Sequence, residues 1–74
     1  MPQAMACQIV NQVKDRRVER GWSQEQLSAL AGVSRQSINS IERNRYVPSL
    51  ELALRLAQIF DSTVEAIFQL EELP

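Results

Sequence analysis

Residues 34–43 hold a series of serine, arginine, glutamine and asparagine side chains, all of which can make hydrogen bonds to DNA base edges and to phosphates. On a helical wheel of about 100° per residue, these polar side chains share one arc and two isoleucines lie opposite them. A merely solvated helix face more often carries lysine and glutamate in pairs four residues apart. The pattern favours a helix that contacts nucleic acid, with an ordinary polar face as the alternative. The polar arc consists of Arg35, Gln36, Asn39, Ser40 and Arg43.

The net charge of the 74-residue chain is −1, but this charge is unevenly distributed. Residues 1–46 carry seven basic and four acidic side chains, whereas residues 47–74 carry one arginine and five carboxylates. The first part is therefore +3 and the second part is −4. A phosphate backbone responds to the local charge rather than to the average over the chain. The acidic average thus does not exclude nucleic acid as a partner of the first 46 residues.

The composition excludes most catalytic and metal sites. The chain has no histidine and only one cysteine, Cys7, which excludes a zinc site, an internal disulfide and a Ser/His or Cys/His pair. There is no glycine-rich phosphate loop either. We therefore expect a protein that is not an enzyme and that uses no cofactor or metal. A lone thiol, without a signal peptide or an apolar run of membrane-spanning length, is typical of a cytoplasmic protein.

Helix start and stop signals position the polar arc within one domain that comprises residues 1–74. Asn11 is expected to cap a first helix that ends near Arg20. Ser23 and Gln26 have the spacing of a capping box, and Ser34 can cap the following helix. Only residues 32–34 separate these two helices, which is the length of a helix-turn-helix corner. The expected elements are a helix over 11–20, a helix-turn-helix over 23–43, helices over 49–60 and 63–68, and, as an option for the chain ends, a short strand pair.

The helix expected over 49–60 is apolar around most of its circumference. Leu52, Leu56 and Ile59 lie on a side that one small core does not need, and Leu70 lies in the short tail. These four residues are candidates for the interface of a homodimer. In the alternative, the chain termini fold over them.

Arg17 interrupts the apolar stripe of the first helix, between the directions of Val10 and Val13. An arginine buried there needs a carboxylate partner, because an unpaired buried charge is costly. The alternative is that its guanidinium reaches solvent at the edge of the stripe. Glu42 lies at the border between the polar arc and the isoleucines of the helix over 34–43.

Several segments resemble, in order and spacing, the phage Cro/repressor-type helix-turn-helix family, also called the XRE family. Residues 20–27, RGWSQEQL, are similar to its GxSQEELA opening, and residues 31–38, AGVSRQSI, to its LGVSRxTI corner. IERN at 41–44 and PSL at 48–50 resemble its IERG and PSLxxL, and residues 61–68 resemble its closing GVSLDELF. The resemblance covers about residues 9–68. It implies an all-α fold, a compact five-helix lambda-repressor-like DNA-binding domain.

The resemblance also implies roles for individual residues. Gln24 matches a phosphate-binding glutamine, and Arg17 and Glu42 match a buried ion pair. Arg35 suits guanine, while Gln36 and Asn39 suit adenine. The implied DNA-binding residues are Gln24, Ser34, Arg35, Gln36, Ser37, Asn39, Ser40, Arg43, Asn44, Arg45 and Tyr46.

Two departures from the family pattern concern the backbone and the helix packing. Asn44 stands where the family usually has glycine, and asparagine tolerates a left-handed backbone. Ser28 replaces an alanine, so its hydroxyl needs an acceptor one turn back.

Together these features predict a homodimeric transcriptional regulator, of the repressor class, that binds a palindromic operator in double-stranded DNA. The helix over 34–43 would lie in the major groove, with half-sites about 10 bp apart. The alternative is a protein-interaction or antitoxin-type module that acts mainly through a partner protein. The polar arc favours DNA binding, because an interaction module has no need for it.

Overall fold

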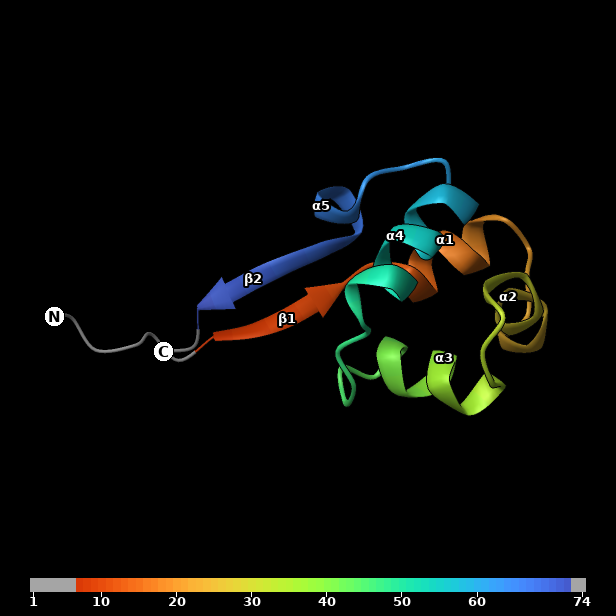
Figure 1. Ribbon diagram of the computed structural model, residues 1–74, viewed down its shortest axis with the longest axis horizontal. Helices are drawn as coiled ribbons and strands as arrows, with labels where there is room; N and C mark the ends of the chain where they lie inside the picture. The colour runs from red at the N-terminus through yellow and green to blue at the C-terminus, as the bar shows by residue number, and fades with distance from the viewer. Residues whose placement is uncertain (1–6, 73–74) are drawn as a thin grey trace, which may run out of the picture.

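A computed structural model describes residues 7–72 of the chain, which form five helices and two strands. Figure 1 shows the helices gathered into one body and the two strands extending away from it. No helix within the described residues is long and apolar enough to cross a membrane. The predicted five-helix fold with a strand pair from the chain ends is therefore confirmed. The elements are β1 (Cys7–Asn11), α1 (Val13–Glu19), α2 (Gln24–Ala31), α3 (Arg35–Glu42), α4 (Leu50–Ile59), α5 (Val64–Ile67) and β2 (Phe68–Glu72).

The two strands pair in antiparallel register, with Ile9 opposite Leu70 and Asn11 opposite Phe68. Because side chains alternate along a strand, these four residues share one face of the ribbon. Asn11 thus ends a strand, and Gln12 takes the N-cap position that was predicted for Asn11, although the Asn11 Oδ1 still accepts from the N–H of Val13, the first residue of α1, at 3.0 Å. The helix begins at Val13 after Gln12, whose side chain makes no capping hydrogen bond.

Serine caps and a left-handed glycine produce the short corner between α2 and α3. Ser23 accepts from the backbone N–H of Gln26 at 3.0 Å, and the Gln26 side chain accepts from the Ser23 N–H at 2.7 Å. Gly32 ends α2 with φ +71°, a conformation that favours glycine. Ser34 then caps α3, so two helices meet within three residues.

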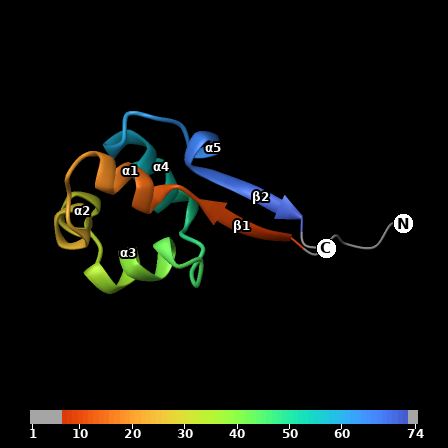
Figure 2. The ribbon, with the colours of Figure 1, turned by 180° about the vertical axis from the view of Figure 1, so that it is seen from behind.

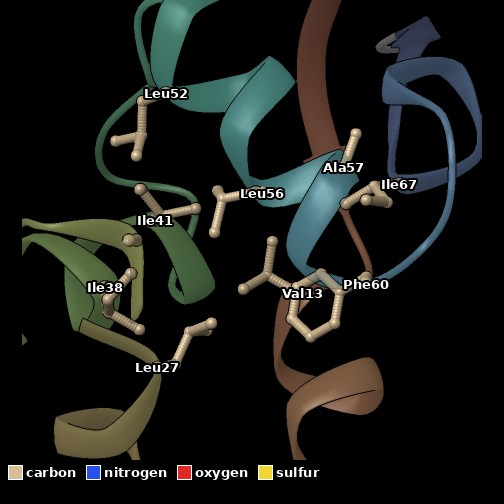
Figure 3. Close-up of a cluster of buried hydrophobic side chains, with 10 residues drawn as sticks. Val13, Leu27, Ile38, Ile41, Leu52, Leu56, Ala57, Phe60 and Ile67 are labelled. Atoms are coloured by element: carbon tan, nitrogen blue, oxygen red, sulfur yellow. The ribbon is translucent and has the colours of Figure 1, made fainter. Parts of the chain in front are cut away.

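One cluster of apolar side chains joins all five helices, and Figure 3 shows its members pointing toward one another. Ile38 and Ile41 are fully buried in it, which places the apolar side of α3 inward. Ser28 is also buried, and its hydroxyl donates to the carbonyl of Glu25 at 2.7 Å, the acceptor that the sequence required. The cluster consists of Val13, Leu27, Ala31, Ile38, Ile41, Leu52, Leu56, Ala57, Phe60 and Ile67.

The interpretation of Leu52 and Leu56 as surplus interface residues is wrong. Leu52 is 7% exposed and Leu56 is fully buried, so both already belong to the core of this chain. Ile59 is half-buried against the same core, whereas Leu70 is 75% exposed. The apolar residues that α4 leaves in solvent lie on its other flank, and they are Leu50 and Leu54, which are 71% and 51% exposed.

Candidate nucleic-acid interface

The outward side of α3 forms the centre of the candidate interface. In Figures 1 and 2, α3 lies along one edge of the helical body, with α1 and α4 between it and α5. Arg35 and Gln36 are exposed, and Asn39 and Ser40 on the same arc are half-buried. The outward side of α3 therefore carries hydrogen-bonding groups, while its inward side carries buried isoleucines.

The residues that the sequence predicts for DNA binding lie on α3, on the loop that follows it and at the start of α2. A shallow hollow of about 300 Å³ brings five of them together, from both α3 and the loop. Three arginines, one on α3 and two at or beyond its end, give this surface positive charge. The exposed members are Ser34, Arg35, Gln36, Arg43, Asn44, Arg45 and Tyr46, and the half-buried members are Gln24, Ser37, Asn39 and Ser40. The residues that line the hollow are Ser34, Gln36, Ser37, Ser40 and Tyr46.

Ser34 has a structural function at the start of α3. Its Oγ accepts from the backbone N–H of Ser37 at 3.0 Å and shares a second hydrogen bond with the Ser37 hydroxyl at 3.0 Å. The cap satisfies a helix N–H that would otherwise lack a partner. Ser34 therefore fixes the position at which α3 begins.

Replacing Ser34 with alanine is expected to lower the free energy of unfolding by about 1 kcal/mol, because the cap of α3 is lost. Ser40→Ala is the control, since no hydrogen bond of its hydroxyl is present within residues 7–72. Urea unfolding followed by circular dichroism measures both values. Equal stabilities of the two variants would show that the Ser34 cap contributes nothing.

The loop after α3 is held in place by its own backbone and by β1. Asn44 has a φ of +58°, the left-handed conformation that the sequence allows for it. The N–H of Arg45 donates to the Ser40 carbonyl at 2.9 Å. The Asn11 Nδ2 donates to the Ile41 carbonyl at 2.9 Å and to the Asn44 Oδ1 at 3.0 Å. Asn11 thus holds the loop in position. The residues next to Asn11 in the sequence do not indicate this function.

A buried ion pair joins α1 to the end of α3. The Arg17 Nε donates to the Glu42 Oε2 at 2.7 Å, and the Arg17 Nη2 to the Glu42 Oε1 at 3.2 Å. The two side chains are 11% and 2% exposed. The Arg17 Nη1 also donates to the Trp22 carbonyl at 2.8 Å, just before α2. Arg17 therefore fixes α3 relative to the two elements before it.

Gln24 lies at the first position of α2 and contacts α3 directly. Its Nε2 donates to the Glu42 Oε1 at 3.0 Å and to the Asn39 Oδ1 at 3.2 Å. Both N–H groups of the amide are used in this way. A phosphate contact through the same nitrogen would therefore replace one of these two bonds. The resemblance assigns Gln24 to phosphate, but it gives no signal for the contact with Asn39.

The described residues offer nothing that would hold a metal. Residues 7–72 contain no group of three histidine, cysteine, aspartate or glutamate side chains that could bind an ion. Cys7 is exposed at the start of β1. The chemistry of the site is hydrogen bonding and positive charge.

A family model for the helix-turn-helix matches residues 13–67, which include all five helices. The chain belongs to the helix-turn-helix family. It is of the XRE type, as the sequence motifs predicted, and it is a transcriptional regulator with a helix-turn-helix DNA-binding domain. Its family and relatives are regulators rather than enzymes, which confirms that prediction as well.

Two curated relatives of this helix-turn-helix regulator match most of its length. The uncharacterized HTH-type transcriptional regulator YgzD of Bacillus subtilis is 47% identical over 62 residues, which cover 84% of this chain and 94% of the relative. MJ0272 of Methanocaldococcus jannaschii, with the same description, is 42% identical over 62 residues, with the same coverage of 84% and 94%.

Solved structures share the fold of the regulator. The restriction-modification controller protein C.AhdI from Aeromonas hydrophila superposes with a TM-score of 0.69 at 31% identity, over 74% of this chain and 83% of that one. A complex of the SinR and SinI proteins gives a TM-score of 0.66 at 33% identity, over 72% of this chain and 52% of that one. The transcriptional regulator VanUg gives 0.76 at 16% identity over 99% and 97%, a likeness of fold alone.

Proposed function

We propose that the chain is a homodimeric repressor that binds a specific palindromic operator in double-stranded DNA, in the cytoplasm. Residues 34–43 would lie in the major groove. The observation that carries this proposal is the division of α3, whose inner side is sealed by Ile38 and Ile41 while its outer side offers only hydrogen-bonding groups. Such a helix gains contacts by entering the groove and exposes no apolar side chain there.

Phosphates on either side of α3 would fix its register on the duplex. Arg43, Arg45 and Tyr46 are exposed at and beyond the end of α3, and the N-terminus of α2 offers the backbone N–H groups of a helix start to a further phosphate. Contacts to phosphate position a protein, and contacts to base edges give specificity. Arg35 is the best placed group for a two-bond contact with guanine, because it is exposed in the first turn of α3.

Replacing Arg35 with alanine is expected to weaken binding to the operator by about 1–3 kcal/mol and to relax the base preference at one position of each half-site. Lys14→Ala is a control that removes an exposed positive charge from α1. Fluorescence anisotropy with the operator and with single-base variants measures both effects. Unchanged affinity and unchanged base preference in Arg35→Ala would contradict the placement of α3 in the groove.

The homodimer would form through an apolar surface on the side of α4 and the strands. A groove of about 240 Å³ runs between the strand pair, the loop before α4, and α4 and α5, and a second hollow, which Leu54 lines, adjoins it at Leu50 and Val64. Leu50, which lines both, is 71% exposed, and Val47 is 59% exposed. Exposed apolar side chains grouped in this way are typical of a protein interface. The groove is lined by Ile9, Val47, Pro48, Leu50, Ala53, Val64 and Phe68.

The second candidate function is a module that acts mainly through a different partner protein. It is favoured by the same apolar surface, and one structural relative is part of a complex of two proteins, SinR and SinI. A gel-shift titration at several salt concentrations separates the two functions. Binding to DNA that weakens steeply as salt rises supports the repressor, because phosphate contacts release counterions. Absent or salt-independent binding supports the partner-protein module.

A further inference from the structure

The side-chain amide of Asn11 joins the end of β1 to the end of α3, across 30 residues of the sequence. Its Nδ2 donates to the Ile41 carbonyl at 2.9 Å and to the Asn44 Oδ1 at 3.0 Å, so both of its N–H groups are used. Its Oδ1 accepts from the Val13 N–H at 3.0 Å. In Figures 1 and 2, the end of β1 lies beside the loop that follows α3. A reversed amide would place its oxygen against two acceptors and its nitrogen against a donor, so the orientation of Asn11 is determined.

The contact with Asn11 also determines how Asn44 presents its own amide. Asn44 is exposed, and its backbone is in the left-handed conformation directly after the end of α3. Its Oδ1 accepts from the Asn11 Nδ2, and a reversed Asn44 amide would bring two nitrogen donors together. The Asn44 Nδ2 is therefore the end of the amide that is not held, and it has no acceptor within residues 7–72. An exposed residue thus offers two N–H groups to a ligand.

The residues on either side of Asn44 add positive charge to these donors. Arg43 and Arg45 are both exposed. The Arg45 N–H donates to the Ser40 carbonyl at 2.9 Å, so the backbone after Asn44 is also fixed to α3. A DNA phosphate oxygen accepts hydrogen bonds and carries negative charge, and asparagine amides and arginines are among its usual partners.

We propose that Asn11 is a positioning residue for DNA binding, which holds the Asn44 oxygen so that the Asn44 N–H groups bind a phosphate of the operator. Asn11 itself does not touch the DNA. The proposal rests on the proposed function, because it needs the loop after α3 to lie against the DNA backbone. It concerns affinity and not base preference, since a phosphate contact carries no sequence information.

Asn11→Ser is the informative variant, because a serine oxygen still accepts from the Val13 N–H but the N–H groups that hold the loop are lost. Gln8→Ser is the matched control, since it removes from the same strand an amide that donates to Glu71 and not to the loop. Fluorescence anisotropy at about 150 mM salt measures the affinity of each variant for a duplex selected from a random library and for a scrambled duplex. We expect Asn11→Ser to bind both duplexes about five- to tenfold more weakly and to select the same bases, as for a lost phosphate contact. Gln8→Ser should bind both like the unmodified protein.

A double-mutant cycle with Asn44→Gly shows whether Asn11 acts through Asn44. Glycine accepts the left-handed backbone but carries no amide, so Asn44→Gly alone should also weaken binding to both duplexes about five- to tenfold. Adding Asn11→Ser to Asn44→Gly should then weaken binding little further. An equal loss from Asn11→Ser in both backgrounds overturns the proposal, because a general structural role gives that result.

Asn44→Gly keeps the test decisive if Asn11→Ser does not fold, because it leaves the Asn11 side chain and its bond to Val13 in place. Unchanged affinity of Asn44→Gly overturns the proposal. Unchanged affinity of Asn11→Ser, or a changed base preference in its selected DNA, overturns it as well. In these cases the unmodified protein still binds DNA, so the proposal fails alone. If the unmodified protein binds neither duplex, the proposed repressor function fails together with it.

Discussion

Replacing Glu42 with alanine is expected to lower the free energy of unfolding by about 3–5 kcal/mol, the largest effect of any single substitution considered. The Glu42 side chain is 2% exposed and holds Arg17, which is itself 11% exposed. Without the carboxylate, the guanidinium remains in the interior without its partner. Gln24 also loses an acceptor. Because small domains are only marginally stable, much of the protein should be unfolded at 37 °C.

Removing one charge of the ion pair is expected to cost much stability, because the other charge then stays buried without a partner. The net attraction between the two charges is expected to be small. The double variant Arg17→Met/Glu42→Leu replaces both charges by apolar side chains of similar size and should recover much of the lost stability. Urea unfolding of Arg17→Met, Glu42→Leu and the double variant gives the coupling between Arg17 and Glu42. A loss below about 1 kcal/mol in Glu42→Ala would show that the pair is not needed to hold α3.

Replacing Leu54 with aspartate is expected to prevent dimer formation and to weaken operator binding by about 10²- to 10⁴-fold. Leu54 is 51% exposed on the flank of α4 that the core does not cover, and it lines the hollow next to the apolar groove. A carboxylate buried between two copies would have no partner there. Once separated, each copy binds one half-site alone and loses the advantage of a linked second site.

Val18→Asp is the matched control for this substitution, because Val18 is 57% exposed on α1, outside the groove. Sedimentation velocity gives the mass of each variant, and fluorescence anisotropy at constant salt gives its affinity for the operator. Circular dichroism shows whether the helices are intact. A folded Leu54→Asp protein that still sediments as a dimer, with unchanged affinity, would exclude this flank of α4 as the interface.

Local signals in the sequence predicted the helices well, because each helix start depends on a few adjacent residues. Ser23 with Gln26, Ser34 and Ser49 all cap the helices that follow them. The last helix, α5, likewise starts at a capping side chain, Thr63, which accepts from the N–H of Ala66. The start of the first helix was placed too early, because Asn11 pairs with Phe68 across most of the chain length.

The division of the apolar residues of α4 between core and surface could not be predicted from its helical wheel. The wheel shows which side chains share a side, but the helices that pack against α4 decide which part is covered. Leu52 and Leu56 face the cluster around Ile41, while Leu50 and Leu54 remain in solvent. The same limit applies to Asn39 and Gln24, whose contact depends on how closely α2 approaches α3.

Measurement of the discrimination between specific and nonspecific DNA tests the central claim most directly. The dissociation constant of the unmodified protein would be determined for a duplex selected from a random library and for a scrambled duplex of equal length and composition, both at about 150 mM salt. If α3 recognises base edges while the arginines around it bind phosphates, we expect a palindromic duplex with half-sites about 10 bp apart to bind at least about 10³-fold more tightly. Equal affinities for the two duplexes would contradict recognition of DNA sequence by this protein.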